Sequence, residues 1–222
     1  MSKTWIPFLE KYEKSLLNKY GKPKKPIIAI SGLAGVGKGT HSKLLQQRLE
    51  KEMKLKLKIY ESSDFFRKAA KQYGYSEARL VEFNKRITED RRLAEKIDYY
   101  IDTKTLETIW KNGGIFVGRI TFAVAGNWGF KIFLKVDPKI AAERIHKDGT
   151  RPEHGLDLQT IMDDLIKRDE VDMKRYKMIY GIDYNKLSKK CDAIVVNHDG
   201  IEQTSDKIFA TTKKWLKKNK FV

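Results

Sequence analysis

The chain has 222 residues, of which 41% are hydrophobic and 34% are charged, and its formal net charge at pH 7 is +17. This length and this apolar content exclude a disordered polypeptide and favour one globular domain with room for small insertions. Apolar runs shorter than the roughly 20 residues of a membrane span, and an N-terminus without a signal-peptide pattern, exclude a membrane-spanning or exported chain. A soluble cytoplasmic protein without a membrane partner is expected, and its oligomeric state is left open.

The cysteine and charge content restrict the function further. A single cysteine, Cys191, excludes an internal disulfide and a cysteine-based zinc site. The excess of 46 Lys and Arg over 29 Asp and Glu predicts a positive surface that attracts polyanions. Nonspecific nucleic-acid binding fits this charge, but a lysine-rich solvated surface explains it more simply.

The N-terminal residues 1–25 are predicted to form an appended helix and a basic linker. Apolar side chains recur at helical spacing over residues 3–20, and Gly21 and Pro23 then break the pattern. The helix is expected to pack on the core of a single domain that covers residues 26–222.

Five short apolar runs alternate with helical patterns in this domain. The runs predict strands at residues 26–30, 57–60, 114–117, 131–136 and 193–196. Helices are expected over 63–112, with breaks at Gly74 and near Ile87, then over 157–180 and 201–218. The alternation predicts a three-layer α/β fold, in which about five parallel strands are flanked by helices.

A glycine-rich turn follows the first predicted strand and leads into a helical pattern. Backbone N–H groups of such a turn curl around phosphates, and a lysine at its end reaches the β- and γ-oxygens of a nucleotide. The turn predicts a site for ATP and Mg²⁺, with Thr40 near the metal, although Gly39 separates Thr40 from the lysine. The residues assigned to it are Gly32, Gly35, Gly37, Lys38, Gly39 and Thr40.

The end of the second predicted strand carries polar residues that suit a phosphate. Ser62 supplies a hydroxyl, and the planar guanidinium of Arg67 matches phosphate oxygens. Asp64 can hold magnesium-bound water, since Mg²⁺ keeps most of its waters and needs one or two carboxylates. Helix capping by Ser62 or Ser63, and a surface role for Asp64, explain the same residues equally well.

Residues 168–175 read RDEVDMKR. Arg168, Asp172 and Arg175 lie on one helix face at spacings i, i+4 and i+7, so they can point into one cleft. Arginines that bridge donor and acceptor oxygens stabilise the charge of a phosphoryl-transfer transition state. A solvated helix face with salt bridges is the alternative interpretation.

The glycine turn and the RDxxDxxR segment together resemble the adenylate and cytidylate kinase group, a branch of the P-loop nucleoside monophosphate kinases. The likeness runs from Ile27 to about Asn197, and residues 175–183 are most similar to the archaeal cytidylate kinases. It implies an acceptor-binding region at about residues 62–112 and a lid at about residues 146–160.

The resemblance also implies roles in acceptor binding. Ser62 and Asp172 would contact the acceptor ribose. Arg67 and Arg119 would hold the acceptor phosphate.

Transfer and donor binding are assigned by the same resemblance. Lys38, Arg168 and Arg175 would be the catalytic residues. Arg144 would stack on the donor adenine, although a surface arginine is nearly as good an interpretation of that position.

Two positions depart from the family pattern. Family members usually carry an acid just before Gly118 that serves the hydration shell of Mg²⁺, and many bacterial cytidylate kinases carry an acid after Arg119 that reads cytosine. Here these positions are Val117 and Ile120.

The expected reaction is transfer of the γ-phosphoryl group of ATP to CMP or dCMP. The alternatives are an AMP, UMP or non-nucleotide acceptor, and a nucleotide-binding ATPase or RNA-associated protein with little kinase activity.

Overall fold

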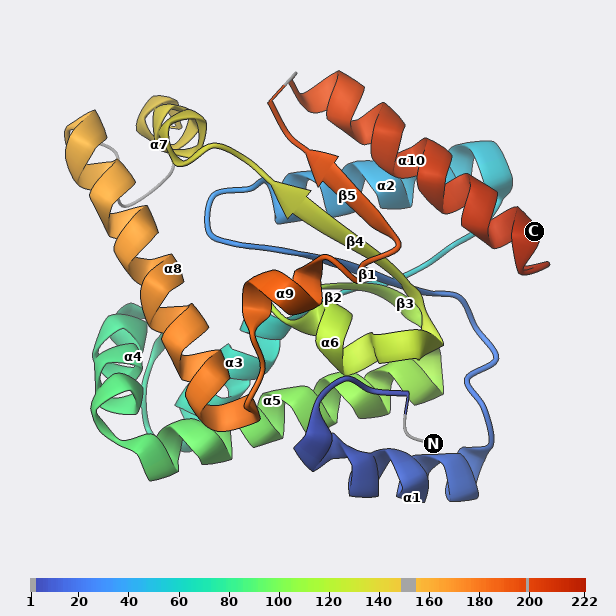
Figure 1. Ribbon diagram of the computed structural model, residues 1–222, viewed down its shortest axis with the longest axis horizontal. Coiled ribbons are helices and arrows are strands. Elements are labelled where there is room, and N and C mark those ends of the chain that lie inside the picture. The colour runs from blue at the N-terminus through green and yellow to red at the C-terminus, as the bar shows by residue number, and fades with distance from the viewer. Residues whose placement is uncertain (1–2, 149–154, 199) are drawn as a thin grey trace.

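The computed structural model of the protein describes residues 3–148, 155–198 and 200–222. Five parallel strands form one sheet in the order β2-β3-β1-β4-β5, with helices on both faces (Figure 1). The predicted α/β fold is therefore confirmed. The strands are β1 (Ile27–Gly32), β2 (Ile59–Glu61), β3 (Gly114–Gly118), β4 (Phe130–Lys135) and β5 (Ala193–Val196). The α-helices are α1 (Glu10–Tyr20), α2 (Lys38–Met53), α3 (Ser62–Gln72), α4 (Leu80–Glu89), α5 (Arg91–Asn112), α6 (Thr121–Ala125), α7 (Pro138–Lys147), α8 (Leu158–Tyr180), α9 (Tyr184–Ser188) and α10 (Ile201–Lys218), and the 3₁₀ helices are Pro7–Leu9, Glu77–Arg79 and Gly126–Trp128.

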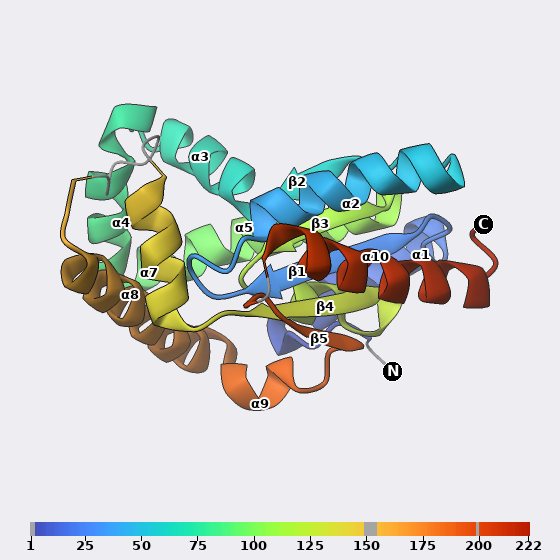
Figure 2. The ribbon, with the colours of Figure 1, turned by 90° about the horizontal axis from the view of Figure 1, so that it is seen from above.

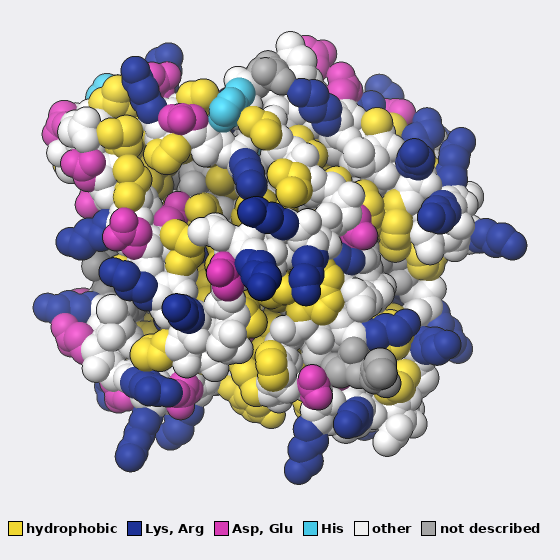
Figure 3. Space-filling model, viewed as in Figure 1, with side chains coloured by type: hydrophobic (Ala, Val, Ile, Leu, Met, Phe, Trp, Pro, Cys, Tyr) yellow, Lys and Arg dark blue, Asp and Glu magenta, His cyan; other side chains and the backbone are white. Residues whose placement is uncertain are grey.

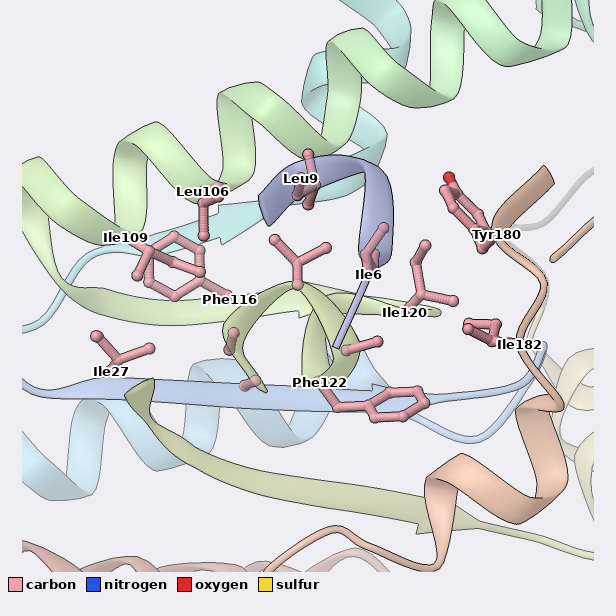
Figure 4. Packing of buried hydrophobic residues seen from close by; sticks show 14 of the residues in the cluster. Ile6, Leu9, Ile27, Leu106, Ile109, Phe116, Ile120, Phe122, Tyr180 and Ile182 are labelled. Carbon is pink, nitrogen blue, oxygen red and sulfur yellow. The ribbon is translucent and has the colours of Figure 1, made fainter. Parts of the chain in front are cut away.

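The central strand explains why the apolar runs are continuous. All six residues of β1 are buried, because the sheet is covered on both faces. Ile28 and Ile30 face α2 and α10, whereas Ile27 and Ala29 face α5 and α6. Figure 4 shows the second of these clusters, in which Phe116 lies beside Leu106 and Ile109 of α5.

The N-terminal segment lies on the α5 and α6 side of the sheet (Figure 1). Its helix α1 begins at Glu10 and not near residue 3 as predicted, since Pro7 opens a separate 3₁₀ turn. The backbone before Pro7 pairs elsewhere: the N–H of Trp5 donates to Ala123 O at 2.8 Å, and that of Thr4 donates to the buried Glu13 carboxylate at 3.0 Å. These contacts fix the segment to the core.

The helical region between β2 and β3 breaks at a position other than the one predicted. The second break falls at Asp90 and not at Ile87, because the Asp90 carboxylate caps α5 by accepting from Leu93 N at 3.0 Å. Helix α3 begins at Ser62 with Glu61 at the N-cap position, so Ser62 and Ser63 lie inside its first turn. Neither predicted serine cap is therefore correct.

Helices α7 and α8 lie side by side at the end of the molecule where the parallel strands terminate (Figures 1 and 2). Asp157 caps α8 by accepting from Thr160 N at 2.9 Å, and Gly181 ends it in the left-handed conformation, as predicted. Of the predicted lid at residues 146–160, residues 149–154 lie outside the described part of the chain.

The surface is dominated by basic side chains. Figure 3 shows Lys and Arg spread over one face and gathered near its centre, with fewer acidic side chains between them. Across residues 3–148, 155–198 and 200–222, no helix combines the length and the apolar character that a bilayer span requires.

Candidate active site

The glycine turn occupies the carboxyl end of β1, between α2 and the ends of the neighbouring strands. At Gly32 a Cβ atom would lie 2.5 Å from Leu134 O, and Gly37 adopts a left-handed φ of 83°, so neither position accommodates a side chain easily. The ammonium of Lys38 folds back over the turn and donates to Gly32 O at 2.9 Å and to Leu33 O at 2.6 Å. The turn therefore has the shape of a phosphate-binding loop.

A buried asparagine supports this loop from behind. Asn197, which follows β5, donates from Nδ2 to Val36 O at 3.0 Å and accepts from Thr204 Oγ1 at 3.0 Å. Its backbone N–H also donates to Lys135 O at 2.7 Å. The loop is thus tied to β4, β5 and α10.

The electrostatic environment of Lys38 identifies the groups gathered around the loop. Burial is the largest cause that lowers its pKa to about 7, and the nearby guanidinium groups of Arg119 and Arg168 lower it further. The carboxylates of Asp169 and Glu61 act in the opposite direction. Side chains from β2, the end of β3 and α8 therefore converge on the lysine.

Acidic and basic side chains alternate from the loop to α5. Asp169 on α8 accepts from the loop amide of Ala34 at 3.0 Å and lies 3.8 Å from Arg119 Nη1. Arg119 also pairs with Asp172, which lies 3.3 Å from Arg175. The hydroxyl of Tyr184 donates to Arg119 O at 3.0 Å and fixes the backbone at the end of β3.

Arg175 connects this series to α5. Its Nη1 lies 3.5 Å from the buried Asp98, whose carboxyl pKa is raised by burial and partly lowered again by Arg175. Within the described part of the chain, Arg175 Nε and Asp98 Oδ2 are buried without a hydrogen-bond partner. Buried polar groups are normally satisfied, so these two atoms suit a bound polar ligand. Asp102 sits one turn further along and accepts from Tyr180 Oη at 2.7 Å.

Arg67 lies apart from this series of charges, on the first turns of α3. It pairs with Asp64 and lines a pocket of about 320 Å³ between α3 and the turn that precedes α4. Ser62 contacts Gly118, where a Cβ atom would collide with its hydroxyl oxygen. The pocket residues are Arg67, Lys71, Tyr75, Ser76, Glu77 and Leu80.

The two remaining predicted residues flank the loop. Thr40 is exposed on the first turn of α2. Arg144, on α7, is close enough to lower the pKa of His41, although burial of the imidazole is the larger cause. Both therefore lie at the loop end of the sheet.

Comparison with known proteins gives the family. A family model described as an AAA domain matches residues 28–170. Cytidylate kinase from Methanothrix thermoacetophila is 32% identical over 168 residues, which cover 73% of this chain and 83% of the relative. That from Pyrococcus horikoshii is 30% identical over 164 residues, or 74% and 76% of the two chains. The chain belongs to the cytidylate kinase family.

The fold of this family member is also found among kinases of other substrates. Shikimate kinase from Bacteroides thetaiotaomicron superimposes with a TM-score of 0.55 at 14% identity, covering 86% of this chain and 98% of that protein. This likeness shows the shared fold alone. The predicted resemblance to a P-loop kinase is confirmed.

The two departures from the family pattern both lie in apolar surroundings. Val117 is 5% exposed and packs in the cluster between the sheet and α2, whereas Ile120 is 7% exposed and packs on the opposite side with Ile6 and Tyr180 (Figure 4). An acid at residue 120 would enter the core of this cytidylate kinase family member. Its acceptor base must therefore be recognised from other elements.

Sequence reasoning missed three residues of this site. Asp169, Glu61 and Asn197 contact the loop or influence its lysine. Glu61 is the last residue of β2 and Asn197 follows β5, and polar residues at the carboxyl ends of parallel strands are a signal that could have found them. Asp169 lies inside the RDxxDxxR segment, but nothing in the sequence distinguishes it from an acid on a solvated helix face.

Proposed function

We propose that the protein is an ATP-dependent nucleoside monophosphate kinase that converts CMP or dCMP to the diphosphate. The observation that carries the proposal is the approach of two arginines from separate elements, Arg119 and Arg168, to the lysine of the phosphate loop. Binding of ATP alone does not require this concentration of positive charge. Transfer between two phosphate groups does, because charge spreads over the oxygens of both.

The loop and α8 would bind the donor. Amides of the glycine turn and Lys38 would hold the β- and γ-phosphates. The Ala34 amide, which donates to the Asp169 carboxylate in the free protein, would donate to a phosphate oxygen instead. Arg144 would contact the adenine. Arg168 and Arg175 would neutralise the transferred group while a phosphate oxygen of the acceptor attacks the γ-phosphorus in line and ADP departs.

Helices α3 to α5 would bind the acceptor, within residues 62–112. Arg67 lies on α3, the helix that Ser62 begins, and Arg119 follows Gly118, which Ser62 contacts, so each guanidinium would bind the monophosphate from its own element. Asp172 pairs with Arg119 and Arg175 in the free protein. Once these arginines bind phosphate, Asp172 would accept a hydrogen bond from a ribose hydroxyl of the acceptor. The 320 Å³ pocket beside Arg67 has room for part of a small ligand and offers the carboxylate of Glu77 as an acceptor for an exocyclic amine.

The residues present also fit a magnesium ion. The Thr40 hydroxyl on the first turn of α2 and the carboxylate of Glu61, the last residue of β2, are oxygen ligands of the kind that Mg²⁺ prefers. When bound, the ion would neutralise charge on the β- and γ-phosphates.

The proposal is tested by ADP formation from ATP and Mg²⁺ with CMP, dCMP, UMP, AMP or GMP supplied singly, beside a control without acceptor. The expected result is acceleration by CMP or dCMP. A faster rate with another nucleotide would retain the mechanism and replace the acceptor. Equal rates with and without every acceptor would instead favour a nucleotide-binding ATPase, for which the apolar Val117 is the supporting observation.

Arg67→Ala is expected to raise KM for CMP at least about 10-fold, because charge-assisted hydrogen bonds to an anion each contribute roughly 1.5–3 kcal/mol. KM for ATP should stay within about twofold, since Arg67 lines the pocket of α3 and not the loop. Steady-state kinetics with each substrate varied in turn measures both constants. Arg91→Ala, on the exposed start of α5, is the matched control. An equal rise of both KM values would contradict an acceptor role.

When ATP binds above pH 7, the protein is expected to take up a proton from the solvent. The free protein lowers the pKa of Lys38 to about 7, and phosphates favour the charged ammonium and raise that pKa again. At pH 8 the free lysine is mostly neutral, so about 0.9 proton per ATP should be bound, and affinity should fall as pH rises above 7. Calorimetry in two buffers of different ionisation enthalpy measures the uptake. Uptake that persists in Lys38→Met would rule out this lysine as its source.

A further inference from the structure

The apolar Val117 does not supply the Mg²⁺-binding carboxylate that the family usually carries at this position of the proposed site. In the register of the sheet, Val117 on β3 pairs with Glu61 on β2. Neighbouring strands lie about 4.8 Å apart, so the two side chains originate side by side at the same end of the sheet. The carboxylate missing from β3 is therefore present on the adjacent strand.

The alternation of side chains shows which way Glu61 faces. The preceding residue, Tyr60, stacks on Phe116 with ring centroids 5.3 Å apart, in the cluster on the α5 side of the sheet. Ile59 and Val117 belong to the cluster on the α2 side. Since successive residues of a strand point to opposite faces, Glu61 projects on the α2 side, where Lys38 and Thr40 begin the helix.

Electrostatics and hydrogen bonding agree with this direction. The Glu61 carboxylate is close enough to Lys38 to oppose the lowering of its pKa, although β3 separates β2 from β1, the strand that leads into the phosphate loop. Ser63 Oγ donates to Glu61 Oε2 at 3.1 Å and holds one oxygen. In the described part of the chain, Oε1 has no such donor. Asp64, the sequence-based candidate, is instead paired with Arg67 on the exposed face of α3.

We infer that Glu61 is the carboxylate that holds the hydration shell of Mg²⁺ bound to ATP in this protein, in place of the acid that Val117 lacks. The ion would lie between the Glu61 carboxylate, the Thr40 hydroxyl and the phosphates of the nucleotide. Mg²⁺ accepts this arrangement because it keeps several waters and needs one or two carboxylates beside the phosphates. The inference rests on the proposed use of ATP but not on the identity of the acceptor.

The test measures metal binding without turnover. Calorimetry gives the Kd of ATP in EDTA and in excess Mg²⁺, and the ratio of the two is the gain from the metal. Glu61→Gln is expected to lower this ratio about 10-fold or more, the loss typical for removal of a residue that orients metal ligands. The loss should appear as a weaker Kd in excess Mg²⁺, whereas the Kd in EDTA should not rise, because Glu61→Gln removes a negative charge near the phosphate site; ATP binding in EDTA also shows that the variant is folded. Asp64→Asn should keep the ratio of the wild type.

A rescue experiment separates a metal role from a structural one. Val117→Asp, added to Glu61→Gln, is expected to restore the ratio because it returns a carboxylate to the adjacent strand. An unchanged ratio in Glu61→Gln, or an equal loss in Asp64→Asn, would overturn the inference. If the Mg²⁺-dependent gain in ATP affinity depends on Glu61, the inference is supported even where CMP is not phosphorylated. If this gain is independent of Glu61, the inference is refuted even where CMP is phosphorylated.

Discussion

Lys38→Met is expected to lower kcat for phosphoryl transfer about 100- to 1000-fold, because a preorganised group that stabilises transition-state charge in a dry site commonly contributes 10²–10³. Lys38 is partly buried, and its ammonium is held over the loop by Gly32 O and Leu33 O. Methionine has a similar length and is apolar, so the loop should keep its shape. Rapid-quench measurement of ADP formation with saturating substrates checks the value.

The matched control is Lys43→Met, an exposed lysine on the same helix. It should leave kcat within about twofold, as surface substitutions usually have small effects. If Lys38→Met turned over at a rate comparable with Lys43→Met, the role of the loop lysine in transfer would be wrong.

Arg168→Ala is expected to reduce kcat about 1000-fold while the Kd of ATP changes only a few-fold, since arginines that contact a transferring phosphoryl group contribute 10³–10⁵ to kcat. Arg168 is an exposed residue of α8 and lies near enough to Lys38 to influence its pKa. The prediction thus separates transfer from binding. Single-turnover kinetics gives kcat, and calorimetry gives Kd.

Lys167→Ala is the control for this substitution, because Lys167 is the neighbouring exposed cation on α8. A loss of ATP affinity as large as the loss of kcat would show that Arg168 contributes to ground-state binding. A normal kcat would remove Arg168 from the transfer step.

Much of the fold could be predicted because its signals are local. Each strand is a short apolar run bounded by polar residues or glycine, and all five predicted strands agree with the structure to within two residues. The last helix, Ile201–Lys218, has the predicted bounds. The start of the N-terminal helix was wrong where a backbone group has a distant partner: Trp5 N pairs with Ala123 O, which no local pattern around Trp5 indicates. The break at Asp90 is instead a local cap that was overlooked.

The candidate site divides in the same way. The glycine turn could be predicted because its function depends on backbone shape within nine residues. The pairing of Ala34 with Asp169 could not, because the two residues are 135 positions apart and only the packing of α8 brings them together. Asp98 is a further example: its contact with Arg175 joins two helices whose sequences give no sign of each other.

The position of the N-terminal segment has a consequence for the order in which the chain folds during synthesis. The residues of this segment are made well before their partners, because Trp5 donates to Asn127 and Phe8 stacks on Tyr180, 5.2 Å away. Until α8 has been made, Phe8 cannot meet Tyr180. Contacts between residues so distant in sequence are slow to form, since the intervening loop must close first. The beginning of the chain is therefore expected to be among the last parts to become native.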